Sequence, residues 1–458
     1  MNRLHITLND RKRFVFPAAM AAVLVLLAAG ANARAYTVWC VPNTSVNPGC
    51  TAVPSPDTIQ GAVNSAASFD IIFVGPGTYH ESVRITSPGG IRDGISLFGA
   101  QAGHDARVDR HDPSKESIVD ATLKAGPAFL VTANYVVIDG FTVQGGTVGS
   151  TVGSPGAGIY IARSGTTTPC AEQDENLCGP QVLNSILQDN SGGVYLSDVE
   201  GAAIERNLFT NNNAENAEVY GFGIVAGFSE GVVITENEFT ENKAAAMAVG
   251  FTEGATLTKN TSENDGAFVI FEYTTGCQFS HNQGKNFGHE GVIAFGTHVY
   301  PDAAVDIGPD NSSLEISYNE LENGTAPISN GIAFTNIYGG GSNHLLNVVH
   351  NKIKQFPDYG IVAKVHAGTG MLYNSSIIDN GVYDNGRDGI LIEAAEHDNF
   401  GIDLFDNNAS GNANFDCKDE TTYGTGTPLP TGNTWFNNNG ILNSPAGLCT
   451  PVTLHEHH

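Results

Sequence analysis

The chain has 458 residues and a formal net charge of −27, with 48 acidic against 21 basic residues. This balance argues against nucleic acid and anionic membranes as partners, because both are themselves negatively charged. The acidic residues are dispersed along the chain, which indicates a solvated outer face that keeps a secreted protein soluble.

The first 35 residues have the pattern of a secretory signal peptide. Arg11, Lys12 and Arg13 precede an apolar run from Ala18 to Ala29, and Ala33-Arg34-Ala35 supplies the small residues of a signal peptidase site. The run is too short for a membrane anchor. We therefore expect cleavage near Ala35, a secreted, extracellular or periplasmic product, and no membrane span in the mature chain.

A lead segment, residues 36–56, is followed by a predicted capping helix. Asp57 can cap this helix, whose apolar residues fall on one face: Ile59, Ala62, Val63 and Ala66. Such a helix closes the open end of a hydrophobic stack. A strand from Asp70 to Val74 and a Gly75-Pro76-Gly77 turn come next.

One phrase then recurs with a period of about 22 residues: an alternating strand, an Asn, a few residues, often a second Asn, and a Gly-led apolar strand. It is clearest at Ile234–Asn237, Leu257–Asn260, Phe279–Asn282 and Ile316–Asn319, and similar phrases begin near Asn184, Asn207, Asn351, Asn380 and Asn407. The strands are short and no stretch is long enough for a repeated helix. This pattern predicts a single-stranded parallel β-helix of roughly eleven coils over residues 57–458, an all-β solenoid.

Coils of a parallel β-helix stack at about 4.8 Å, so equivalent residues lie above one another. We expect the recurrent Asn residues to occupy a left-handed bend and to bond to the Asn of the next coil, which keeps buried polar atoms paired. This role is structural.

At these residues the chain resembles the right-handed parallel β-helix superfamily, which includes the pectate-lyase-like proteins and secreted repeat proteins of the NosD type. The most specific part is Thr58 to Ala66 followed by Asp70 to Glu81, which in the family forms the capping helix, the first strand and a Pro-Gly turn into the second strand. The resemblance implies a right-handed helix with function in a groove outside one sheet. The catalytic motifs of pectate lyases, polygalacturonases and mannuronan epimerases have no counterpart here.

All seven cysteines lie in the part predicted to be secreted, where oxidation is allowed. Their spacing favours three local bridges, Cys40 with Cys50, Cys170 with Cys178, and Cys417 with Cys449, although spacing alone does not establish connectivity. Cys277 is left over at a strand position that is apolar in other coils, so we expect a buried, inert thiol.

Long insertions break the coil period, and two of them, near His298–Ser313 and Asn336–His344, follow a Gly-led strand and are predicted walls of a cleft. The Gly-led strands at Gly291, Gly331, Gly360 and Gly389 share a register. Their second and fourth residues should point inward. Candidate substrate-binding residues at this cleft are Thr335, Asn336, His298 and Tyr300.

Lys364 and Glu393 should point outward on successive coils, and His366, Glu396 and His397 lie just beyond them in the chain. These five residues are the candidate catalytic group, and Glu272 extends the same line. Carboxylates can protonate a glycosidic oxygen and activate water, while Lys or His can abstract a proton α to a uronate carboxyl. The competing interpretation is ordinary surface polarity, since strand ends carry outward polar residues and surface ion pairs contribute little.

Asp302, Asp306 and Asp310 share one long insertion and are the candidate ligands for Ca²⁺, although their spacing fits no fixed calcium loop. Unpaired surface carboxylates are the alternative interpretation. A closing segment begins at about residue 407, and we expect Trp435 to pack over the terminal coil.

The sequence therefore predicts a secreted β-helix that binds an extracellular polysaccharide or envelope glycan and cleaves or modifies it, in the manner of a lyase or hydrolase. The alternative is a non-catalytic surface or matrix protein. The residues alone do not decide between them.

Overall fold

The computed structural model describes residues 36–42, 50, 56–108, 110, 112–124, 126–147, 156–163, 176–214, 221–288, 292–294, 297–299, 303–325, 330–334, 342–363, 372–393, 399–421 and 432–451. The signal peptide predicted over residues 1–35 lies outside this part. Residues 37–458 form one compact unit. In the described part of the chain, no helix has the length and apolarity that crossing a membrane requires.

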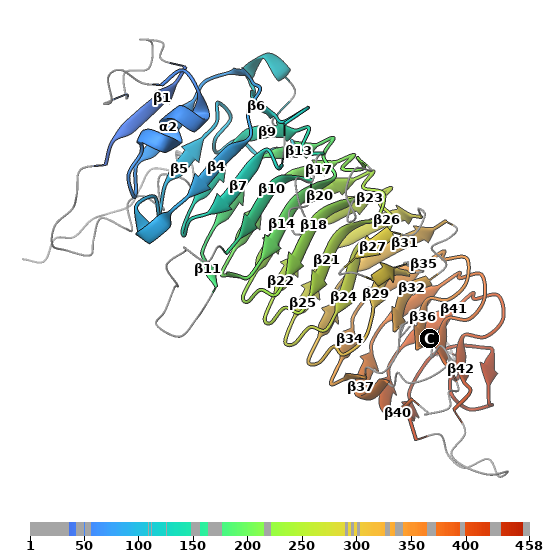
Figure 1. Ribbon diagram of the computed structural model, residues 1–458. Coiled ribbons are helices and arrows are strands. Elements are labelled where there is room, and N and C mark those ends of the chain that lie inside the picture. The colour runs from blue at the N-terminus through green and yellow to red at the C-terminus, as the bar shows by residue number, and fades with distance from the viewer. Residues whose placement is uncertain are drawn as a thin grey trace, which may run out of the picture. The chain divides into compact units, whose positions relative to one another are not determined.

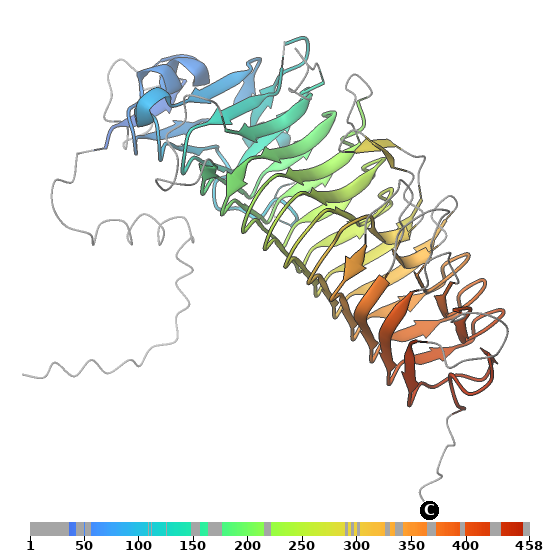
Figure 2. The same cartoon turned by 60° about the horizontal axis from the view of Figure 1, so that its bottom comes forward.

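Three long parallel sheets, here sheets A, B and C, follow one another in every coil. Both views show the strands of each sheet stacked in chain order, from blue to red (Figures 1 and 2). The predicted all-β parallel β-helix is thus confirmed. Sheet B has twelve strands within the described residues, close to the predicted number of coils.

Sheet A contains fifteen strands. They are β1 (Val38–Val41), β2 (Ile71–Val74), β5 (Ser96–Phe98), β8 (Val137–Asp139), β12 (Gln181–Leu183), β16 (Ala203–Glu205), β19 (Val233–Thr235), β22 (Thr256–Thr258), β25 (Gln278–Ser280), β30 (Glu315–Ser317), β33 (Asn343–His344), β34 (Asn347–Val349), β37 (Leu372–Ile378), β40 (Phe400–Phe405) and β43 (Thr434–Phe436).

Sheet B is reached from sheet A by one or two residues in each coil from β8 onward. Its strands are β3 (Gly77–Tyr79), β6 (Ser117–Asp120), β9 (Phe141–Gln144), β13 (Ile186–Gln188), β17 (Leu208–Thr210), β20 (Glu238–Thr240), β23 (Thr261–Glu263), β26 (Gln283–Phe287), β31 (Glu320–Gly324), β35 (Lys352–Lys354), β38 (Gly381–Tyr383) and β41 (Asn408–Ser410).

Sheet C completes each coil with thirteen strands. They are β4 (Val83–Thr86), β7 (Phe129–Thr132), β10 (Ala157–Ala162), β14 (Gly192–Ser197), β18 (Phe222–Gly227), β21 (Ala245–Gly250), β24 (Val269–Glu272), β29 (Ala303–Ile307), β32 (Asn330–Phe334), β36 (Ile361–Ala363), β39 (Ile390–Ile392), β42 (Cys417–Asp419) and β44 (Asn443–Ser444). Outside the three sheets, β11 (Leu177–Cys178) pairs with β15 (Val199–Glu200), and two short 3-10 turns span Pro88–Gly90 and Pro113–Lys115.

The capping helix is α2 (Ile59–Ser65), which packs against β1, β2 and β4 and buries Ile59, Ala62 and Val63 as predicted. Its cap differs from the prediction. Thr58, not Asp57, has the extended backbone of an N-cap, and its hydroxyl accepts a hydrogen bond from the Gly61 amide at 3.1 Å. The Glu81 carboxylate accepts from the amides of Ile59 and Gln60, so a residue distant in sequence completes the cap.

The Asn ladder is continuous at the bend between sheets A and B. Each amide Nδ2 donates to the Oδ1 of the next coil at 2.9–3.1 Å, along Asn207, Asn237, Asn260, Asn282, Asn319, Asn351, Asn380, Asn407 and Asn438. The left-handed residue is the one before the Asn, as at Glu236 (φ 55°) and Tyr318 (φ 55°). The residue before each Asn makes the bend. The Asn itself is therefore needed for the hydrogen bonds of its buried side-chain amide.

The cysteine predictions are confirmed where the structure describes both residues. Disulfides join Cys40 to Cys50 and Cys417 to Cys449. Cys178 is disulfide-bonded, and its predicted partner, Cys170, lies outside the described residues. Cys277 is a buried free cysteine whose pKa is raised by burial.

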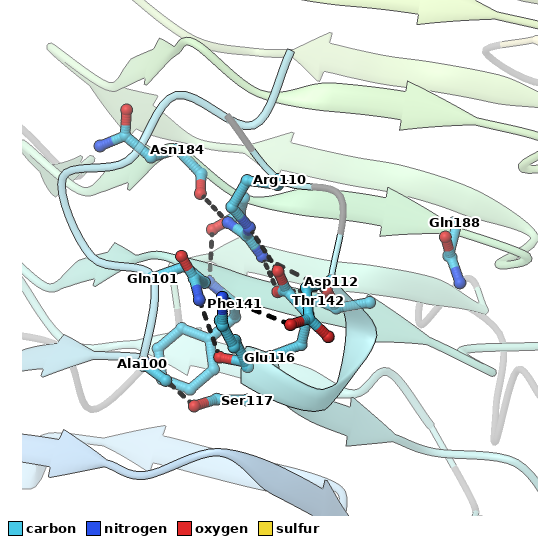
Figure 3. Close-up of polar contacts among 12 residues, drawn as sticks. Ala100, Gln101, Arg110, Asp112, Glu116, Ser117, Phe141, Thr142, Asn184 and Gln188 are labelled. Carbon is cyan, nitrogen blue, oxygen red and sulfur yellow. Dashed lines mark hydrogen bonds and ion pairs between the residues drawn. The ribbon is translucent and has the colours of Figure 1, made fainter. Parts of the chain in front are cut away.

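A strap, residues 99–116, connects β5 to β6 and packs at the N-terminal end of sheet B (Figure 3). The Arg110 guanidinium is fully buried and forms a two-point ion pair with Glu116, in which Nε donates to Oε1 at 2.8 Å and Nη2 donates to Oε2. It also donates to the Asn184 carbonyl and to the Thr142 hydroxyl. Earlier in the strap, Arg107 Nη2 lies 3.9 Å from Glu236 Oε2. The strap therefore contacts several coils.

The C-terminal coil is closed as predicted. Trp435 lies in β43, packs against the core, and donates its indole N–H to Asp419 Oδ2 at 2.8 Å. The Cys417–Cys449 disulfide ties this coil to β42.

Candidate functional site

Sheet C carries two rows of residues that alternate with the core and point away from the coil interior. The central row runs along Tyr160, Tyr195, Val225, Ala248, Ile270, Asp306, Ala333, Val362 and Leu391. These apolar members pack in two clusters separate from the main core. The second row contains Ser197, Gly227, Gly250 and Glu272. Apart from half-buried Tyr160, the central row is buried, so this outward face of sheet C is not a solvated sheet face.

The predicted register of the Gly-led strands is confirmed for three of the four. Ile332 pairs with Ile361 and Ile361 with Ile390, and these residues lie in the core, so the second and fourth positions of the strands point inward. Glu393 follows Ile392 and is half-buried. The other predicted residues of this group, Thr335, Asn336, Lys364, His366, Glu396 and His397, lie outside the described residues.

The prediction for the Gly291 strand is wrong. Val292–Ala294 forms β27, which pairs antiparallel with β28 (Thr297–Val299) in a hairpin outside sheet C. The sheet C strand of this coil is β29, in which Val305 pairs with Val269 and Ile332. Both segments are short runs of mostly apolar residues, and only the pairing with neighbouring coils selects between them. His298 lies in β28, its side chain and Tyr300 lying outside the described residues.

This correction also changes the predicted calcium ligands. Asp306 is a residue of β29 with 2% exposure, so it is part of a coil and not of an insertion. Asp310 occupies a left-handed turn (φ 54°) and accepts a hydrogen bond from the Ser342 amide at 2.8 Å. Asp302 lies outside the described residues. Among the residues that the structure describes, no group of three or more His, Cys, Asp or Glu could hold a metal ion, and calcium stays a prediction.

Glu272 is the most perturbed carboxyl of this face. It is 7% exposed, and burial raises its pKa to about 7. Its side chain extends over Gly308 in the next coil, where a Cβ would come within 2.9 Å of Glu272 Cγ. Gly308 therefore leaves the room that the carboxyl occupies. Glu272 was noted in the sequence only as an extension of the predicted line.

Glu272 and Asp306 form an acidic pair on one face. Glu272 follows Phe271, the partner of Ile307, and Asp306 precedes Ile307. The two residues are thus on adjacent strands with an offset of two positions, or roughly 8 Å between Cα atoms from the spacing and rise of β-strands. Two carboxyl groups on one face of a sheet can divide the roles of proton donor and proton acceptor.

In chain order, long connections stand directly before or after several strands of sheet C. Segments 148–155, 215–220 and 289–302 connect strands of sheet B to sheet C, while 164–175, 335–341, 364–371 and 394–398 follow strands of sheet C. One predicted cleft wall, His298–Ser313, contains the sheet C strand β29, and the other, Asn336–His344, follows the sheet C strand β32 in the chain. Function in a regular scaffold is disproportionately carried by inserted segments, and these segments adjoin the strands of sheet C in the chain.

A second feature, a cleft of about 380 Å³ on the outer face of sheet B, was not predicted. It is lined by Glu238, Phe239, Thr261, Ser262, Glu263, Gln283, Gly284, Lys285, Glu320 and Glu322. The sequence does carry a signal for it. Outward positions of sheet B are Ile186 and Leu208 in earlier coils and become Glu238, Thr261 and Gln283 in later ones.

Residues 128–300 match the family described as the right-handed β-helix region. No curated protein matches the chain significantly. Similar solved structures include the DFA-IIIase of Arthrobacter chlorophenolicus A6 without its lid, at 14% identity and a TM-score of 0.48, covering 82% of this chain and 94% of that one.

Two further similar structures have the same low identity. The A-module of the mannuronan C-5 epimerase AlgE6 of Azotobacter vinelandii is 13% identical with a TM-score of 0.48, covering 84% of this chain and 94% of that one. The alginate lyase of Paenibacillus sp. str. FPU-7 is 14% identical with a TM-score of 0.43, covering 69% and 91%. Similarity at this level does not identify a substrate.

Proposed function

We propose that this right-handed parallel β-helix binds an extracellular polysaccharide across the outer face of sheet C, and that Glu272 acts there as a general acid. The observation that carries the proposal is the Glu272–Asp306 pair, two carboxyl side chains held out of water on one face. Buried carboxyl groups are rare unless the protein uses or pairs them.

The chemistry follows from the surroundings of Glu272. Burial disfavours its charged form, so a large share of the molecules hold a proton on this carboxyl at neutral pH. A protonated carboxyl can donate to a glycosidic oxygen, and Asp306 would accept a proton from the attacking water. The net reaction is hydrolysis of a glycosidic bond.

A lyase-like reaction on the same face uses the basic residues predicted from the sequence. Lys364 or His366 would remove the proton α to a uronate carboxyl, with Glu393, Glu396 and His397 near them, and Thr335, Asn336, His298 and Tyr300 would contact the chain. Because the protein is strongly acidic, a polyuronate would require a bridging cation such as Ca²⁺. Of the three ligands predicted from the sequence, Asp302 and Asp310 remain proposed ligands, since Asp306 is a buried residue of β29. Signal peptide cleavage near Ala35 would bring the protein to such a substrate.

The test is a screen of the mature protein against neutral and acidic polysaccharides, with and without Ca²⁺. Reducing ends report hydrolysis and ultraviolet absorbance of unsaturated products reports elimination. Glu272→Gln and Asp306→Asn should each reduce turnover by about a hundredfold or more, while Glu253→Gln, an exposed turn residue, is the matched control and should leave it unchanged.

Two results would contradict catalysis at this face. Equal turnover by wild type and Glu272→Gln would place the chemistry elsewhere. Retained glycan binding without turnover on any substrate would favour the alternative, a non-catalytic β-helix that binds glycan at the cell surface or in a matrix.

A further inference from the structure

The outer face of sheet B has two different halves. Near the N-terminal end, its outward residues Ile118, Thr142, Ile186 and Leu208 are buried or half-buried. The strap lies at this end, with Arg110 bonded to Thr142 and to the coil of Asn184 (Figure 3). Toward the C-terminus the strap reaches the coil of Glu236, where Arg107 lies 3.9 Å from Glu236 and interacts electrostatically with Glu238.

Beyond Glu236 the same outward row becomes polar and open. It runs through Glu238, Thr261, Gln283, Glu320 and Lys352. Thr261 and Gln283 are exposed, and the 380 Å³ cleft begins at Glu238. The end of the strap and the start of the cleft therefore coincide.

The floor of the cleft includes small residues on its two central strands, β23 and β26. Short polar Thr261 and the backbone of Gly284 line it, while Glu238 and Glu320 stand on the flanking strands. At the inward position, Ser262 and Gly284 stand where the flanking strands have Phe239 and Leu321. Phe268 and Phe287 pack against Gly284 on the inside. The residues that line the trough come from four neighbouring strands of sheet B, β20, β23, β26 and β31.

Most charges at this trough already have a partner. Lys285 pairs with Glu263 at 3.2 Å, Lys352 with Glu320 at 2.6 Å, and Lys354 with Glu322 at 2.8 Å. Such exposed pairs attract a free ion weakly, because each carboxylate is largely neutralised. A ligand rich in hydroxyl groups could form hydrogen bonds with the remaining lone pairs and N–H groups of these ion pairs. It could also bond to the Thr261 hydroxyl and the Gln283 amide.

We infer that this trough is a second binding site, which takes a neutral, hydroxyl-rich oligosaccharide segment. The inference rests on the proposed function, because it places another segment of the same class of ligand on a different face of the coil. Binding outside the reacting face would hold a long polymer on the protein between reaction events.

The experiment measures binding of neutral and cationic polysaccharides to the full mature chain by titration calorimetry at low and high salt. Thr261→Trp and Gln283→Trp fill the trough at exposed strand positions that accept aromatic residues. Asn408→Trp, an exposed residue of the same outward row beyond the cleft, is the matched control. Circular dichroism and thermal unfolding establish that each variant is folded.

A site in the trough predicts that both trough variants weaken binding of a neutral polysaccharide by about tenfold or more, that Asn408→Trp does not, and that added salt has little effect. Equal glycan binding by all three variants would overturn the inference and leave the proposed function intact. Binding that is confined to cationic polymers and lost at high salt would do the same. Absence of any glycan binding by wild type would overturn both. Glu272→Gln separates the two sites further, since it should lose turnover and keep trough binding.

Discussion

Asp265 occupies a position that asparagine holds in the preceding coils of a second ladder. Asn190, Asn212 and Asn242 each donate to the next coil, and Asn242 ends this run on Asp265 Oδ1 at 2.8 Å. The side chain of Asp265 has no N–H group to donate to the next coil. Its other oxygen accepts from the Ser262 hydroxyl at 2.6 Å, so Ser262 replaces an apolar inward residue in order to satisfy this carboxyl.

Burial raises the pKa of Asp265 to about 7. Because the folded value lies above the unfolded one, near 4, the folded state binds more protons between these pH values and stability falls as pH rises through that window. Asp265→Asn should therefore raise the free energy of unfolding at pH 8 by about 2 kcal/mol and much less at pH 4. Denaturant unfolding at both pH values checks this, and a gain independent of pH would contradict it.

Glu272 links activity to stability at the residue scale. Its raised pKa, about 7, predicts that kcat/KM falls as pH rises through neutrality, because the proton donor is lost. The same shift means that Glu272→Gln should stabilise the protein at pH 8 by about 1–2 kcal/mol, since a buried carboxyl is no longer ionised. A pH–rate profile and thermal unfolding of the variant measure the two effects. A stabilised variant with undiminished turnover would show that burial of Glu272 is only structural.

At the scale of elements, the strap depends on the Arg110–Glu116 pair. Arg110→Met leaves the Glu116 carboxylate buried without its partner and should destabilise the protein by about 3–5 kcal/mol. The double variant Arg110→Met, Glu116→Leu should lose less, because neither charge remains. Lys115→Met removes the exposed Lys115–Asp112 pair, 3.3 Å long, and is the matched control, with an expected change below about 1 kcal/mol. The midpoints of denaturant unfolding measure these changes in stability. Equal losses of stability in Arg110→Met and Lys115→Met would contradict the proposed role of the strap.

Elements with strong local signals were predicted well. The Asn phrases, the Pro-Gly turn and the apolar face of α2 depend on neighbours in sequence or on the coil period, and each is present in the structure. The predicted strand at Gly291 failed because Val292–Ala294 and Ala303–Ile307 have equal local patterns. Which of the two joins sheet C depends on pairing with β24 and β32, which no local window contains.

For the whole molecule, the solenoid makes its last coil the weakest, because that coil has a neighbour on one side only. The Cys417–Cys449 disulfide spans 32 residues at this end and should contribute about 3–4 kcal/mol. Cys417→Ser with Cys449→Ser should accelerate hydrogen exchange in β40, β42 and β43 first, while the coils around β21 stay protected. Uniform exchange along all coils would show that the β-helix unfolds as one unit and not from its end.

The sequence alone determined the class of fold, the coil period, the buried Asn ladder and the acidic surface, because each is repeated or summed along the chain and survives an error at any single coil. The tertiary structure alone decided which sheet faces the insertions, that Asp306 belongs to a coil, and that Glu272 lies buried over Gly308. These features arise from contacts between coils 22 to 37 residues apart, and a one-residue change of register would turn each side chain to the opposite face of its sheet.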